Sequence, residues 1–145
     1  MSNGLILGAT VFVLTVVVQV IAVIALVRFL RRQDRLGGID ARFWYATWTL
    51  VGAMLILFVG HMFQAGVWAA LFHRLGAFEE FETAFYHSAV NFSSLGYGDI
   101  VMPEELRLLG ALEAAGGVLM FGLSAGVGFA LITSMLQAQK EKDAD

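Results

Sequence analysis

A short run of residues near residue 96 has the composition needed to bind a cation that has lost its water. This segment, here called the glycine run, covers residues 93–99 and reads Ser-Ser-Leu-Gly-Tyr-Gly-Asp. In a narrow pore, inward-pointing backbone carbonyls can replace the water shell of a cation. Successive carbonyls all point inward only if alternate residues take unusual backbone angles, which Gly96 and Gly98 can reach without steric cost. Because the Ser94 hydroxyl adds one oxygen, the run predicts an ion site of backbone and hydroxyl oxygens.

One chain supplies only one strand of such oxygens, so a closed ring requires several copies of the chain. Non-helical backbone at membrane depth is tolerated only where it lines a water-filled path. The glycine run therefore predicts an assembly around a central pore.

The residues before the glycine run predict a short helix. Glu79, Glu80 and Glu82 precede apolar residues that recur at roughly helical spacing. Acidic residues in a first turn favour a helix start, so we expect about a dozen helical residues from near Glu80 to near Phe92. The partly negative C-terminal end of this helix would point at the pore axis and favour a cation.

The composition of the whole chain indicates that its solvent is a lipid bilayer. Of 145 residues, 59% are hydrophobic and 14% are charged, and the mean hydropathy is +0.76. Residues 5–27, 43–72 and 108–136 are each long and apolar enough to cross the ~30 Å hydrocarbon core as a helix. We expect an all-α membrane protein with three transmembrane helices, a short pore helix and a filter loop. The net charge of −3 argues against a nucleic-acid partner, and the absence of cysteine excludes thiol chemistry.

Charged residues predict the orientation in the membrane. The loop after the first stretch is rich in arginine, whereas the segment between the second and third stretches is mainly acidic. The positive-inside rule then places this loop and the C-terminus in the cytoplasm and the N-terminus outside. These arginines follow an uncharged span, so we expect them to fix topology or contact anionic lipid rather than sense voltage. The expected lipid contacts are Arg28, Arg31, Arg32 and Arg35.

Local signals mark the ends of the spans. Asp40 is expected to cap the second helix. We expect an aromatic belt of Trp44, Tyr45 and Trp48 at the inner membrane interface, with Trp68 toward the outer one. The polar tail, residues 137–145, is expected to fray.

Three features in this order resemble the pore of potassium channels. They are the short helix, the stretch Gly96-Tyr97-Gly98-Asp99, and a following helix that contains Gly117-Val118-Leu119-Met120-Phe121-Gly122. The resemblance covers residues 78 to 136, and the second span more loosely. The whole chain is similar to small prokaryotic channels with one pore loop per subunit, and its first span is additional to their two-helix pore.

The resemblance implies a homotetramer in a prokaryotic plasma membrane that conducts K+ passively, with no organic cofactor and no enzymatic activity. Residues 43–136 would form the pore domain, preceded by an extra helix and basic loop (1–42) and followed by a cytoplasmic tail (137–145). The K+ sites would be formed by the carbonyls of Ser94, Leu95, Gly96 and Tyr97 and by the Ser94 hydroxyl, with Gly98 completing the filter. The expected gating and pore-lining residues are Gly117, Val118, Phe121, Ala125 and Phe129.

Two filter positions depart from the family pattern, and one pair of side chains is expected to support the filter. Ser94 replaces the usual threonine and Leu95 the usual valine, so the hydroxyl is kept but a methyl group is lost. Asp99 is expected to brace the filter from behind, with Tyr86 as its partner. Val90 occupies a place where some relatives have an additional acid.

Glu113 is the only carboxyl group within the three apolar stretches. A carboxylate that faces lipid is costly, so we expect Glu113 to face protein. The candidate partners are Asn91, Ser88, His87 and His61. The contact is either a fixed clamp of the third span behind the filter or a group whose protonation makes the current depend on pH.

Several alternatives remain open at this stage. A nonselective cation channel would share the scaffold, and a non-conducting membrane assembly or regulatory subunit would not need the glycine run. Gly117 is either a gating hinge or a site of close helix packing. His61 and His87 are expected to make buried polar contacts.

Overall fold

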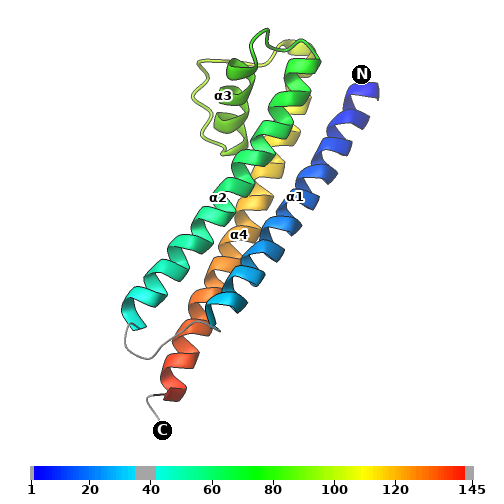
Figure 1. The fold of residues 1–145 in the computed structure, drawn as a ribbon. Coiled ribbons are helices and arrows are strands. Elements are labelled where there is room, and N and C mark those ends of the chain that lie inside the picture. Colours follow the sequence, from blue (N-terminus) through cyan, green and yellow to red (C-terminus); the bar gives the residue numbers. More distant parts are fainter. Residues whose placement is uncertain (1, 35–41, 143–145) are drawn as a thin grey trace.

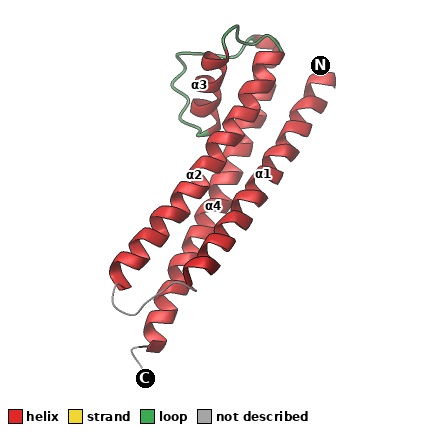
Figure 2. Ribbon diagram, in the orientation of Figure 1, coloured by secondary structure: helices red, strands yellow, loops and turns green. Residues whose placement is uncertain are grey.

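The computed structural model of the protein describes residues 2–34 and 42–142, and this part of the chain is entirely helical with connecting loops (Figure 2). The elements are α1 (Ser2–Asp34), α2 (Arg42–Arg74), α3 (Phe81–Phe92), the 3-10 helix η2 (Glu104–Leu106) and α4 (Arg107–Lys142). The predicted all-α class, with three long helices and one short one, is confirmed. The predicted cap Asp40 lies outside the described residues.

The three long helices run alongside one another, and α3 lies beside the upper half of α2 and α4 (Figure 1). Segments Ile6–Arg32, Thr47–Arg74 and Glu104–Ser134 are each long and apolar enough to cross a membrane. The helix α1 packs against both α2 and α4. The fold is thus a three-helix bundle with a short helix and a loop held against one end.

The boundaries of α3 and α4 follow from local chemistry. Glu80 precedes the first turn of α3 in extended conformation, and Glu82 lies within that turn, where a negative charge is favourable. Pro103, the only proline in the chain, immediately precedes η2 and α4. Proline fits there because the first N–H groups of a helix have no partner within the helix.

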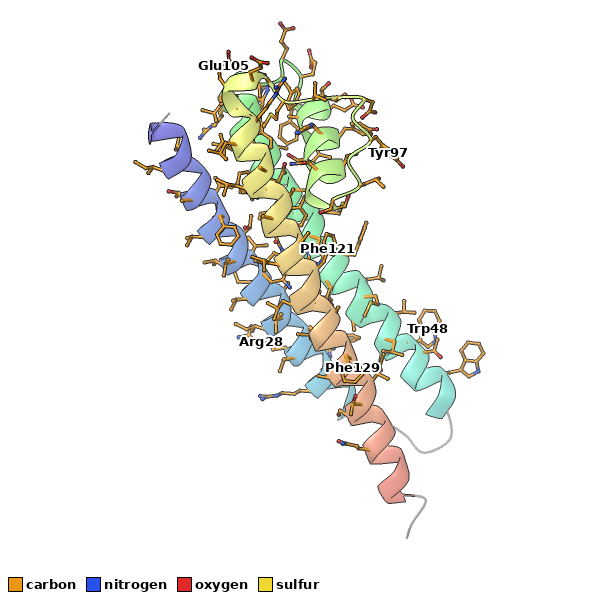
Figure 3. The ribbon with its side chains drawn as sticks, turned by 180° about the vertical axis from the view of Figure 1, so that it is seen from behind. Arg28, Trp48, Tyr97, Glu105, Phe121 and Phe129 are labelled. Carbon is orange, nitrogen blue, oxygen red and sulfur yellow. The ribbon has the colours of Figure 1, made fainter. Side chains whose placement is uncertain are left out.

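The main apolar core joins the upper parts of α2, α3 and α4. Trp68 and Phe72 of α2 and Phe92 of α3 are fully or almost fully buried in this core. Trp68 is therefore no part of an exposed aromatic belt, because its side chain is fully buried in this core, and its level in the membrane stays a prediction. Trp48 of α2, by contrast, projects from the bundle (Figure 3).

The last helix is longer than its apolar stretch. It continues past residue 136 to Lys142, into the segment that was expected to fray. Residues 137–142 are glutamine, alanine, lysine and glutamate, which have high helix propensity and extend an existing helix at little cost.

Candidate ion filter and its supports

The glycine run follows α3 directly and has an alternating backbone. The φ angle is positive at Ser94 (59°), Gly96 (58°) and Gly98 (75°). Hydrogen bonds join the N–H groups of Ser94 and Leu95 to the carbonyls of Asn91 (2.9 Å) and Val90 (3.0 Å). These bonds engage N–H groups at the start of the run, not the carbonyl oxygens assigned to the ion. The positive φ expected at both glycines is confirmed, whereas the binding of an ion there stays a prediction.

The side chains of the glycine run lie on the outside of the single chain. Tyr97 is 67% exposed and points away from the bundle, and Leu95 is also exposed (Figure 3). The expected pore-lining residues Val118, Phe121 and Phe129 are exposed along α4 as well. One chain therefore leaves both the loop and a long apolar face of α4 uncovered.

Tyr86 and Asp99 form the predicted contact behind the glycine run. The Tyr86 hydroxyl donates to Asp99 Oδ2 at 2.7 Å, and the Ile100 N–H donates to Oδ1 at 3.0 Å. The hydrogen bond from Tyr86 holds the pKa of Asp99 below its usual value, and the same bond raises the pKa of Tyr86. The two side chains thereby tie the outer end of the run to α3.

Glu113 faces protein, as expected. Its side chain is fully buried, and Asn91 Nδ2 donates to Glu113 Oε2 at 2.6 Å and to the Gly110 carbonyl at 2.8 Å. Of the other candidate partners, His87 and His61 bond elsewhere. Ser88 on α3 lies beside this carboxyl group, but within the described part of the chain neither its hydroxyl nor Glu113 Oε1 has a partner with hydrogen-bond geometry. The side chain of Asn91 thus links α3 to α4 just before the glycine run.

One turn further along α4, the two helices approach each other closely. A Cβ atom added at Gly117 would collide with the carbonyl oxygen of Phe92, the last residue of α3. Only glycine allows the backbones to come this close. The structure therefore gives Gly117 the packing role, and the hinge stays a prediction.

A cavity of about 320 Å³ lies between α3, the glycine run and the start of α4. His87, a buried residue, borders this cavity. Its Nδ1 lies 3.1 Å from the Ile100 carbonyl, and its Nε2 has no partner among the described residues. The expectation of a buried polar contact is confirmed for His87.

A second group of polar side chains lies lower in the bundle, and the sequence did not reveal it as a group. Gln19 of α1 donates to Ser124 Oγ of α4 at 2.9 Å, and His61 Nε2 of α2 lies 3.0 Å from the same oxygen. Gln64 of α2 donates to Gln19 Oε1 at 2.9 Å. The sequence offered one indication of this group, because each of the four polar residues lies inside an apolar span. His61 makes the buried polar contact that we expected.

The basic residues at the far end of α1 are open to the surroundings. Arg28, Arg31 and Arg32 are exposed, whereas Arg35 lies outside the described residues. Glu105 marks the opposite end of the molecule, near α3 (Figure 3). The exposed arginines of α1 and the acidic residue Glu105 thus lie at opposite ends of the bundle.

Comparison with known proteins identifies the pore region. A family described as "Ion channel" matches residues 56–134, which are more than half of the chain. No curated protein and no solved structure matches the chain. The matched segment contains most of α2, all of α3, the glycine run and most of α4. The protein therefore belongs to the ion channel family, with the pore loop of the potassium-channel type.

Proposed function

We propose that the protein is a homotetrameric channel that conducts K+ selectively and passively. The observation that carries this proposal is the alternation of positive φ at Ser94, Gly96 and Gly98, directly after a short helix. Such alternation lets successive carbonyls face one axis, where they replace the water shell of the ion. The transported ion is the substrate, and no bond is made or broken.

In this proposal each filter residue has a defined part. The carbonyls of Ser94, Leu95, Gly96 and Tyr97 and the Ser94 hydroxyl form the ion sites. The bond between Tyr86 and Asp99 holds the outer end of the filter, and the bond between Asn91 and Glu113 clamps its inner end to α4.

The proposed setting is a prokaryotic plasma membrane with the N-terminus outside and the C-terminus in the cytoplasm. The exposed arginines at the end of α1 would lie at the cytoplasmic surface, where anionic lipid attracts them. The acidic residues around α3 would lie at the outer mouth of the pore and concentrate cations there.

The test is ion flux into liposomes that contain the purified protein. Rubidium, a close substitute for potassium, should enter, sodium should enter far more slowly, and barium should block uptake. Equal rates for sodium and rubidium would favour the nonselective cation channel, and no flux at all would favour a non-conducting assembly.

Replacing the filter glycines tests the assignment of the site. Gly96→Ala and Gly98→Ala should each abolish selective rubidium uptake, because alanine at positive φ is strained and distorts the ring of carbonyls. Gly76→Ala is the matched control, since Gly76 also has positive φ (74°) but lies outside the glycine run, and a Cβ added there meets no atom of the described chain within 4 Å. It should conduct like the parent. Unchanged uptake in both filter variants would contradict the assignment.

A further inference from the structure

The polar cluster of Gln19, His61, Gln64 and Ser124 spans all three long helices. All four side chains are buried, with exposed fractions of 1%, 4%, 0% and 8% respectively. Three contacts of 2.9–3.0 Å connect them in the order Gln64, Gln19, Ser124, His61. Gln19 is the central member, because it both donates to Ser124 on α4 and accepts from Gln64 on α2.

Without Gln19, the polar groups on α2 and α4 would lose their partners on α1. Water is scarce at membrane depth, and an unpaired polar group there costs free energy. Three members of the cluster lie within the segment matched by the ion channel family, whereas α1 lies wholly outside it. The additional helix therefore supplies hydrogen bonds to two buried side chains of the pore domain, Ser124 and Gln64, and is more than a membrane anchor.

The cluster also touches the part of the molecule that bears the filter. The ring of His61 lies 4.3 Å from that of Phe121 on α4 and 6.1 Å from that of Phe92, measured between ring centres. Phe92 is the last residue of α3, and its carbonyl group packs closely against Gly117 of α4. A displacement of Ser124 or His61 would thus reach both the pore-lining helix and the base of the glycine run.

We propose that Gln19 is a positioning residue for ion conduction, which acts through Ser124 and His61 to set the position of α4. This inference rests on the proposed channel function. The bond between Gln19 and Ser124 stabilises the arrangement of α1 and α4 seen in the structure (Figure 1). Any opening or closing motion that slides α4 along α1 must break it, so its loss changes the balance between conducting and non-conducting states.

The experiment compares single-channel open probability in lipid bilayers for the parent, Gln19→Leu, Ser124→Ala and the double variant. Each single variant should change the ratio of open to closed states by about three- to fifteenfold, the range for a hydrogen bond between transmembrane helices. The double variant should show less than the sum of the two single effects, because both substitutions remove the bond between Gln19 and Ser124, while each also removes one further contact, to Gln64 or to His61. The ratio of rubidium to sodium permeability should stay that of the parent.

Thr15→Val is the matched control. Thr15 is buried on the same helix, but its hydroxyl donates to the Phe12 carbonyl of α1 itself (2.7 Å). Valine keeps the shape and removes no bond between helices, so gating should not change. If Gln19→Leu fails to assemble, Ser124→Ala still removes the bond to Gln19, together with the contact to His61, and it leaves the carbon packing unchanged.

The outcomes separate the inference from the function on which it rests. A parent protein that takes up no rubidium contradicts the proposed function and the inference with it. A conducting parent whose Gln19 and Ser124 variants open like the parent contradicts the inference alone. Fully additive effects in the double variant would also overturn it, because the two residues would then act independently.

Discussion

Ser94 is one of the two positions at which the glycine run departs from the potassium-channel pattern. Its φ of 59° lies in the left-handed region, which costs a non-glycine residue about 1–3 kcal/mol and is least favourable for β-branched side chains. The usual threonine would be strained in this conformation. A serine keeps the hydroxyl ligand and avoids the clash of the additional methyl group.

Replacing Ser94 by threonine, the usual residue of the family, should therefore make this protein less stable. Ser94→Thr should lower the free energy of unfolding by about 1 kcal/mol or more per chain, and Ser94→Gly should raise it while removing one ion ligand. Thermal unfolding in K+ and in Na+ would measure both effects. A threonine variant at least as stable as the parent would show that Ser94 is not left-handed in the assembled channel.

The bond between Tyr86 and Asp99 predicts how the end of the glycine run responds to pH. Because the pKa of Asp99 is lowered in the folded protein, its contribution to stability is present above the ordinary carboxyl pKa and is lost as pH falls through the folded value. Because the pKa of Tyr86 is raised, its contribution is lost only as pH rises through that raised value. The bond should thus stabilise the protein between about pH 4 and pH 10.

Tyr86→Phe removes this bond and keeps the ring. The variant should be less stable than the parent at neutral pH, and the two should converge as pH falls below about 4. Thermal unfolding from pH 3 to pH 9 provides the measurement. A difference that is the same at every pH would show that the hydroxyl acts in another way.

At the scale of elements, the close approach of α3 and α4 decides what a substitution at Gly117 can reveal. The Cβ of Gly117→Ala would collide with the Phe92 carbonyl, and backbone cannot yield as a flexible side chain can. We expect the two helices to separate, with a loss of about 1–3 kcal/mol or more in the free energy of unfolding and a displaced filter. Reduced rubidium selectivity and reduced thermal stability should appear together.

Gly122→Ala is the control for this prediction, because no atom of residues 2–34 or 42–142 lies within 4 Å of the Cβ that it adds. It should leave the stability of the single chain almost unchanged. A Gly117→Ala protein of normal stability and selectivity that opens less often would favour the hinge and contradict the packing role.

At the scale of the whole molecule, the exposed surfaces of the glycine run and α4 predict that several copies of the chain assemble. The glycine run and the α4 residues Val118, Ala125 and Phe129 are exposed in one chain, yet a strand of carbonyls binds an ion only as part of a ring. We expect crosslinking of the protein in lipid to reach four chains and stop there. A ladder that ends at one or two chains would contradict the tetramer, and with it the proposed conduction.

The sequence by itself was sufficient to predict the helices, the backbone conformation of the two glycines in the glycine run, and two features that support this run. Long apolar stretches bounded by charges predicted α1, α2 and α4, and the spacing before the glycine run predicted α3 to within one residue of its start. The bond between Tyr86 and Asp99 and the burial of Glu113 were also predicted. These features follow from length, local spacing and the high cost of exposing charge to lipid.

Only the tertiary structure decided which faces of the helices meet. It buried Trp68, brought Gly117 against Phe92, and joined Gln19 to Ser124 across 105 positions of sequence. The physical reason is that lipid tails are as apolar as a protein core, so the apolar pattern of a membrane helix does not distinguish its buried face from its lipid-facing one. Packing of small residues and hydrogen bonds between helices make that choice, and both depend on partners far away in the chain.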